Sequence, residues 1–275
     1  MSNYFFPPEW HPQEWLWIGF PHDGEEWPGF LEPAQAQIAA FANAVADSGQ
    51  EVRLLVRDED NEAGARALCS AKDRLERRSY GDVWLRDTGP LVMIDGAGGR
   101  VARRFGFNGW GGKYLMAGDQ EIGAELARDF GFDRVLWLGD GLVNDHTDGH
   151  VDNLARFVAP GVLALPRATG TDDPNASIYA DAKSRAVAFG VTVREVPSPG
   201  RIETDGRVEP ASYMNFAITT KLVVVPTYGS PHDADGVAAI AALFPDRETV
   251  GLPADAVLAG GGGFHCASQQ MPRAY

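Results

Sequence analysis

The chain has 275 residues, of which 44% are apolar, and a formal net charge of −14 at pH 7. This length can bury a substantial core, while the longest apolar runs, such as residues 222–225, are of strand length and predict no membrane span. The negative charge argues against a nucleic-acid partner, because a phosphate backbone would be repelled, and it would attract a cationic small molecule, although solubility alone also explains it.

No signal peptide is predicted at the N-terminus, which has neither a basic region nor a long apolar core. The chain has two cysteines, Cys69 and Cys266, which are too few for a disulfide framework and show no metal-ligand spacing. Together these features predict a cytoplasmic protein that works in a reducing environment.

The first predicted unit is a strand, a helix and a second strand. The apolar run at 15–20 predicts a buried strand that ends at Pro21. Apolar residues then recur at helical spacing between Pro33 and Gly49, and residues 52–56 predict the next strand.

The same order of elements recurs along the chain without a linker. The further predicted elements are a helix at 119–131, a strand at 135–138, a strand at 161–166, a helix at 173–190, a strand at 191–196, a strand at 222–226 and a helix at 237–244. At least four such units can bury their faces against one another and close into a ring. A doubly wound sheet gives the same alternation, but no Gly-x-Gly-x-x-Gly loop follows the first strand, so we favour a quasi-symmetric α/β ring.

Near the C-terminus, residues 260–266 read GGGGFHC. Glycines let a ligand approach the backbone closely, and a cysteine directly after them is well placed to attack that ligand as a thiolate. A flexible loop beside an ordinary buried cysteine explains the same residues.

A second candidate stretch is DVWLRDTGP at 82–90. In an extended backbone Asp87 would point opposite to Trp84, and a turn at 88–90 would bring both toward one pocket. The structural alternative is a strand end with an internal Arg–Asp ion pair.

The third candidate stretch is DHTDGHVDN at 145–153. Read as a strand, it places His150 and Asp152 on one face. Its aspartates and histidines could also form a metal site, but no third ligand stands at a familiar helical spacing, and a solvated acidic loop is a further alternative.

A cysteine, a histidine and two or more carboxylates therefore come from distant parts of the chain. A Cys–His pair suggests a thiol protease or another acyl transfer. The carboxylates fit a planar cation better, since a guanidinium is matched by bidentate acceptors.

At these residues the chain resembles the agmatine deiminases. They belong to the guanidine-modifying superfamily, which also holds arginine deiminases and amidinotransferases, and they are related to the Porphyromonas-type peptidylarginine deiminases. The motifs that carry the resemblance are residues 84–90, 148–153 and 261–266, together with Trp10, residues 106–114 and residues 225–229. The resemblance covers nearly the whole chain and implies a five-unit α/β propeller, the pentein fold, in a single catalytic domain over residues 1–275.

The resemblance also implies an activity, the hydrolysis of agmatine to N-carbamoylputrescine and ammonia, a step toward putrescine. Cys266 would form the covalent intermediate, His150 would act as acid and then base, and Asp87 and Asp152 would each bind the guanidinium. The other residues expected to contact the substrate are Trp84, Asp82 and Gly263. No metal or organic cofactor is expected, and the oligomeric state stays open.

Three alternatives remain beside this interpretation. The near one is a deiminase of arginine or of peptidyl arginine, and the second is an amidinotransferase, which would pass the amidino group to an amine. The third is a non-catalytic binding protein.

One departure from the family makes the third alternative relevant. Family members carry a further segment, with a Glu-Gly-Gly motif whose glutamate lies in the site, where this chain runs from Gly131 directly to Val135. About one unit is therefore expected to be missing. Either the sequence omits part of the natural protein, which we favour, or the chain is a deletion variant with an incomplete pocket wall.

Overall fold

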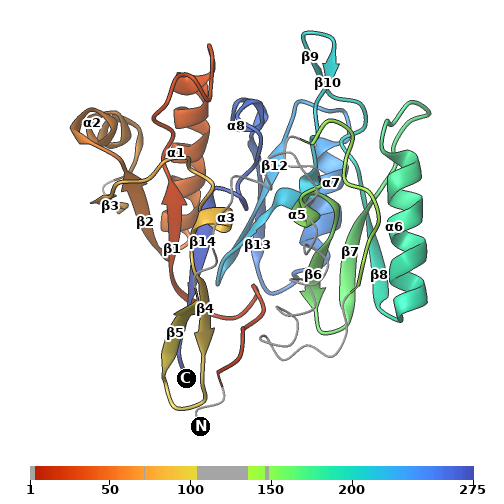
Figure 1. Ribbon diagram of the computed structural model, residues 1–275, viewed down its shortest axis with the longest axis horizontal. Helices are drawn as coiled ribbons and strands as arrows, with labels where there is room; N and C mark the ends of the chain where they lie inside the picture. The colour runs from red at the N-terminus through yellow and green to blue at the C-terminus, as the bar shows by residue number, and fades with distance from the viewer. Residues whose placement is uncertain (1–3, 71, 104–135, 146–148) are drawn as a thin grey trace, which may run out of the picture.

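The computed structural model describes residues 4–70, 72–103, 136–145 and 149–275. The first of its units contains β1 (Gln13–Gly19), α1 (Leu31–Asp47) and β2 (Glu51–Val56). The two strands are parallel, and β14 (Ser268–Pro272) pairs with β1 in the antiparallel sense while β3 (Arg74–Arg77) extends the other edge. The C-terminal strand that follows the cysteine loop is thereby joined to the first strand of the chain (Figure 1).

Two further sheets repeat this arrangement of one antiparallel and one parallel strand pair. One has the order β6-β7-β8 and the other has the order β11-β12-β13. In each sheet the last two strands are parallel and are connected by a helix, as expected for parallel neighbours. Their elements are β6 (Arg156–Ala159), β7 (Val162–Arg167), α6 (Ala176–Phe189), β8 (Thr192–Pro197), β11 (Ala217–Ile218), β12 (Leu222–Thr227), α7 (Asp233–Ala241) and β13 (Glu248–Pro253).

Shorter elements connect the three sheets. In Figure 1, the one-turn helices α3 (Leu85–Thr88) and α5 (Val151–Leu154) lie between the unit that contains α1 and the unit that contains α6. The connecting elements are α2 (Glu59–Leu68), α3 (Leu85–Thr88), β4 (Leu91–Ile94), β5 (Arg100–Arg103), α5 (Val151–Leu154), β9 (Glu203–Thr204), β10 (Arg207–Val208), η2 (Tyr213–Asn215) and α8 (Asp255–Ala259).

The core explains why the sequence forms these units. Helix α1 buries Ile38, Phe41 and Val45 completely, at the helical spacing that the sequence shows. Phe41 meets Phe264 from the cysteine loop, with ring centroids 4.8 Å apart, so the loop is anchored in the main core. At the other end of the molecule, α6 ends where Gly190 adopts a φ of +96°, which an L side chain rarely tolerates.

The α/β class is confirmed, and the predicted strands and helices around residues 15–56, 161–196 and 222–241 are present. The strand predicted at 135–138 is wrong for residues 136–138, which form no regular element. The helix predicted at 119–131 and the motif at 106–114 lie outside the described residues. The closed ring stays a prediction.

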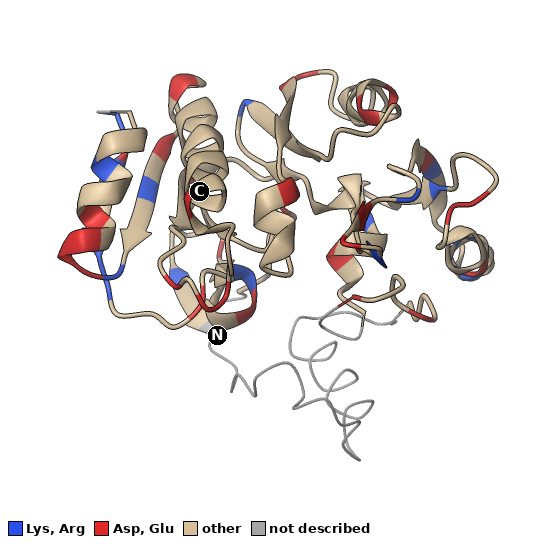
Figure 2. Ribbon diagram, turned by 90° about the horizontal axis from the view of Figure 1, so that it is seen from above, with Lys and Arg blue, Asp and Glu red and all other residues tan. Residues whose placement is uncertain are grey.

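Acidic and basic residues occur on several of the described elements. Figure 2 shows acidic positions on the outer helices and on the loops between them, with basic positions interspersed. None of the described helices is both long and apolar enough to cross a membrane.

Candidate active site

Two one-turn helices carry the predicted polar residues, and both differ from the extended segments expected from the sequence. Trp84 occupies the N-cap position of α3, and Asp87 lies within that helix. His150 occupies the N-cap position of α5, and Asp152 lies in its first turn. The extended interpretation of both stretches is wrong, because a helical turn and not strand alternation brings each pair together. Residues 146–148 lie outside the described residues.

The glycines before Cys266 are required by close packing. A Cβ atom on Gly262 would lie 2.6 Å from the ring of Trp84, and a Cβ atom on Gly263 would lie 2.6 Å from Oδ1 of Asn215. The loop can therefore pass between these two side chains only without side chains of its own. The close packing of Gly262 and Gly263 therefore fixes the position of Cys266 in the site.

Cys266 is 2% exposed and its sulfur contacts polar groups from two other segments. Nδ2 of Asn215 donates to Sγ at 3.0 Å, and the thiol lies 3.3 Å from Oδ2 of Asp152. Burial raises the pKa of the Cys266 thiol well above its usual range, and the negative charges of Asp152 and Asp87 raise it further, while the hydrogen bonds to Asn215 and the Gly263 backbone lower it. The resting sulfur is therefore a thiol, and a bound cation would favour its ionisation.

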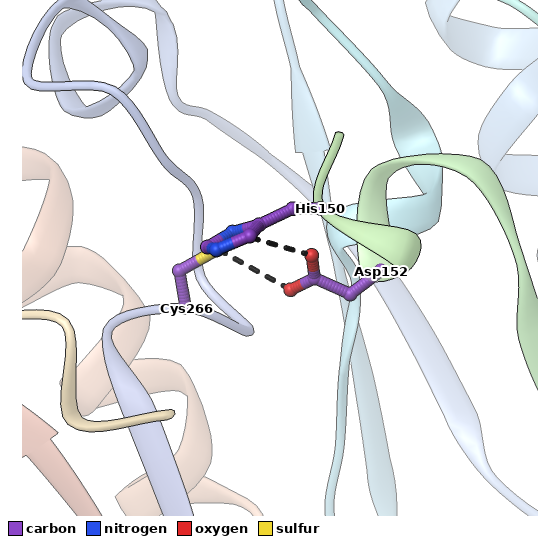
Figure 3. A group of neighbouring side chains, drawn as sticks. All are labelled: His150, Asp152 and Cys266. Carbon is purple, nitrogen blue, oxygen red and sulfur yellow. Dashed lines mark hydrogen bonds and ion pairs between the residues drawn. The ribbon is translucent and has the colours of Figure 1, made fainter. Parts of the chain in front are cut away.

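His150 bridges the two predicted carboxylates. Its Nε2 lies 3.5 Å from Oδ1 of Asp87, and its Nδ1 lies 3.8 Å from Oδ1 of Asp152. Figure 3 shows the imidazole next to the sulfur of Cys266, with the Asp152 carboxylate turned toward both. The structure thus brings together all four residues that the sequence predicts to be catalytic.

A pocket of about 280 Å³ opens onto this cluster, and we call it the polar pocket. Its lining contains five of the predicted residues, part of the predicted glycine loop, and two residues that were not predicted, Glu26 and Ala259. The lining residues are Glu26, Asp82, Trp84, Asp87, His150, residues 259–262 and Cys266. Gly263 and Asp152 are not among them: Gly263 packs on Asn215, and Asp152 lies behind the sulfur.

Asp82 lines the polar pocket together with two other acidic residues, Glu26 and Asp87. Burial raises the pKa of Asp82 to about 6, and the nearby charges of Glu26 and Asp87 contribute, against a hydrogen bond from the Val83 backbone. The negative charges of these neighbours disfavour the ionised form of Asp82, and a bound cation would favour it.

A second cavity of about 600 Å³, the apolar pocket, lies on the other side of Asp152. Most of its lining is apolar, with Glu9, Asp152, Arg156 and His265 as the charged groups. His265 contacts both Asp152 and Glu9, and Arg156 donates to Glu9. The sequence interpretation missed this network. The only signal was that His265 precedes the candidate nucleophile, and nothing in the sequence links Glu9 to it.

Three atoms of the site also resemble a metal site. A ring nitrogen of His150, a carboxylate oxygen of Asp152 and Sγ of Cys266 all lie within 4.8 Å of one another. These donor types suit Zn²⁺. The expectation that no metal is needed stays a prediction, which metal analysis of the purified protein tests.

Solved structures show the class of fold to which this chain belongs. The chain superposes on an agmatine deiminase of Enterococcus faecalis with a TM-score of 0.90 and 24% identity, covering 98% of this chain and 96% of that one. A putative arginine deiminase from Porphyromonas gingivalis gives a TM-score of 0.85 at 24% identity, covering 98% of each chain. An amidinotransferase from Microseira wollei gives 0.51 at 13% identity, covering 99% of this chain and 97% of that one. The fold is the pentein fold that these proteins share.

The sequence identifies the family within that class. The model of the Porphyromonas-type peptidyl-arginine deiminase family matches residues 5–127 and 116–272, and the chain belongs to this family. An agmatine deiminase of Pseudomonas putida is 30% identical, and one of Stutzerimonas stutzeri is 29% identical, each covering 98% of this chain and 96% of the relative.

The comparisons also bear on the expected missing unit. The alignment with the Stutzerimonas protein extends over 361 positions, whereas this chain has 275 residues, so the relative carries residues that have no counterpart here. The position of that difference, between Gly131 and Val135, stays a prediction.

Proposed function

We propose that the protein is an agmatine deiminase, which hydrolyses the guanidinium of agmatine to N-carbamoylputrescine and ammonia. The observation that carries this proposal is a buried thiol that lines the polar pocket together with His150 and Asp87, with Asp152 behind the sulfur. A cysteine protease would have no use for two carboxylates at the nucleophile, whereas a guanidinium needs them.

In the substrate complex, a guanidinium takes the carboxylate oxygens of Asp87 and Asp152 that face His150 in the free protein. Each carboxylate then accepts N–H bonds from the cation, and the ring of Trp84 in the pocket wall supports its face. The positive charge of the substrate offsets the two carboxylates that raise the pKa of Cys266, so binding itself promotes formation of the thiolate.

The chemistry proceeds in two halves. The thiol proton passes to His150 as Sγ bonds to the guanidinium carbon, and His150 then protonates one amino group so that the C–N bond breaks and ammonia leaves. A water molecule next attacks the amidino carbon while His150 takes its proton. The C–S bond then breaks, which restores the thiol and releases the carbamoyl product.

Asp82 and Glu26 form a second pair of acidic residues in the polar pocket. Their negative charge suits the ammonium end of agmatine. Glu26 is exposed, Asp82 and Asp87 are half-buried, and Asp152 is buried, so Glu26 is the acidic residue of this group that lies nearest the solvent. An ammonium on the substrate tail would be attracted there, and the carboxylate of arginine would be repelled. This charge pattern supports agmatine over arginine as the substrate.

An assay with agmatine, free arginine and a peptidyl arginine tests the substrate. We expect ammonia and carbamoyl product from agmatine with kcat/KM at least about tenfold above that for arginine, as one added like-charge contact implies. A preference for either arginine substrate would assign the protein to the near alternative. Amidino transfer to an added amine would make it a transferase, and no product above the Cys266→Ala background from a folded sample would refute the enzyme.

Other features remain proposals of the same kind. We expect a single domain over residues 1–275, a cytoplasmic location, no nucleic-acid partner and no resident cofactor. Intact mass of the natural protein tests the expected omission, because a mass well above 29.7 kDa would show that the segment is present in the cell. Light scattering of the same sample gives the oligomeric state.

A further inference from the structure

His265 lies between two carboxylates on the side of Asp152 that faces away from the polar pocket. The side chain is buried, with Nδ1 2.6 Å from Oδ2 of Asp152 and Nε2 2.8 Å from Oε1 of Glu9. Ionised carboxylates can only accept hydrogen bonds, so both ring nitrogens donate and the imidazole carries a positive charge. Charge-assisted hydrogen bonds are shorter and stronger than neutral ones, and both of these distances are short.

Glu9 is itself held in place by arginines. Arg156 donates to Oε2 of Glu9 and also to the backbone carbonyls of Met214 and Phe216, at 3.0 and 2.7 Å. Burial would raise the pKa of Glu9, but the positive charges of Arg156 and His265 hold it well below its usual range. A charged acceptor that is itself paired with Arg156 therefore stands behind His265.

The two oxygens of Asp152 have different surroundings. Oδ2 lies against His265, against Nδ2 of Asn215 at 3.2 Å, and against the thiol of Cys266. Oδ1 lies 3.8 Å from Nδ1 of His150, on the reacting side. Burial would raise the pKa of Asp152, but the hydrogen bond and charge of His265 lead the effects that lower it well below its usual range.

We propose that His265, backed by Glu9, is a positioning residue that keeps the Asp152 carboxylate ionised and turned so that Oδ1 binds the guanidinium. This rests on the proposed function, since it assigns Asp152 to the cation. His265 would touch neither the substrate nor the reacting atoms. Its effect reaches them through Oδ2 of Asp152, which it holds at 2.6 Å.

Two amide substitutions separate the two hydrogen bonds of His265. In His265→Asn the amide reaches the position of Nδ1 and can still donate to Asp152, whereas in His265→Gln it reaches the position of Nε2 and can contact only Glu9. We expect kcat/KM for agmatine to fall about tenfold in the Asn variant and about 100-fold in the Gln variant, as loss of one charge-assisted bond implies. Both variants lose the charge, so the acid limb of the pH profile should move to higher pH in each.

The apolar pocket allows a test by chemical rescue, because His265 lines it and the cavity has room for an imidazole molecule. We expect His265→Ala to lose most of its activity and to regain at least about tenfold of kcat/KM with millimolar imidazole, as restoration of that bond implies. Asp87→Asn, whose defect lies in the polar pocket, is the matched control and should gain nothing. Glu9→Gln, which can still accept a hydrogen bond from Nε2, should lose only about threefold and serves if His265→Ala fails to fold.

Wild-type turnover of agmatine is measured first, so that failure of the proposed function is seen separately. If the wild type is active and the folded Asn and Gln variants retain its kcat/KM and its acid limb, His265 has no positioning role. Equal losses in both variants that follow only their thermal stability, without a pH shift or rescue, would make the network structural and would overturn the proposal.

Discussion

The two sides of Asp152 differ in how their charge is arranged. On the side of the polar pocket, Asp82, Asp87 and Glu26 face a cavity whose described lining residues include no lysine or arginine. On the side of the apolar pocket, Glu9 and Asp152 are matched by His265 and Arg156. Matched charges stabilise a structure, whereas an excess of one sign leaves a place for a ligand of the opposite sign. We therefore propose that the first side binds the substrate and that the second side orients Asp152.

The largest effect is expected from substitution of the nucleophile. This change should stop the chemistry in the polar pocket and leave the charged network beside the apolar pocket unchanged. Cys266→Ala should lower kcat by at least about 10⁴-fold, because the covalent intermediate can no longer form. Agmatine binding, measured by calorimetry, should persist. Turnover close to that of the wild type would contradict the assignment of Cys266.

Removal of one carboxylate from the polar side should weaken both binding and turnover. Asp87→Asn should lower kcat/KM for agmatine by about 10- to 100-fold, because one charge-assisted partner of the cation is lost. Asp246→Asn, an exposed aspartate outside both pockets, is the matched control. If both variants behave like the wild type, Asp87 does not bind the guanidinium.

The same substitution should affect the free thiol in the opposite direction. The charge of Asp87 raises the pKa of Cys266, so its removal should lower that pKa and increase the thiolate fraction at a given pH below it. Iodoacetamide should therefore alkylate Asp87→Asn a few times faster than the wild type at neutral pH, with each rate rising about tenfold per pH unit. A slower reaction would show that Asp87 does not act on the sulfur through its charge.

The smallest effect is expected at the rim. Because the pKa of Asp82 is raised to about 6, its carboxylate is charged above that pH and becomes neutral as the pH falls through it. The KM for agmatine should rise a few-fold between pH 7 and pH 5 for this reason, and Asp82→Asn should show the higher KM at both pH values. Equal KM values for the variant and the wild type at pH 7 would exclude Asp82 from tail binding.

The sequence predicted the active-site residues better than it predicted their geometry. Helical and strand spacing located the main units. Helix α1, for example, buries Ile38 and Phe41 at the spacing that the sequence shows. The active-site stretches misled the same method, since α3 and α5 each contain a single turn that is too short for periodicity to reveal. Their density of functional side chains identified them as candidates, and their resemblance to a family implied their roles.

The charged network behind Asp152 could not be predicted for a different reason. Its members come from three distant parts of the chain, with a sequence separation of 256 between Glu9 and His265, and they meet only through tertiary packing. Asn215, which contacts Sγ of Cys266 and Oδ2 of Asp152, likewise belongs to no recognisable motif. Pairings of this kind depend on the fold itself and leave no local pattern.

The covalent intermediate is the most direct test of the account. The enzyme is mixed with excess agmatine, quenched in acid during turnover, digested, and analysed by mass spectrometry. We predict an amidino adduct of agmatine on the peptide that contains Cys266, present in the wild type and absent from Cys266→Ala. Full turnover without an adduct on that peptide, together with undiminished product formation by Cys266→Ala, would contradict the central claim.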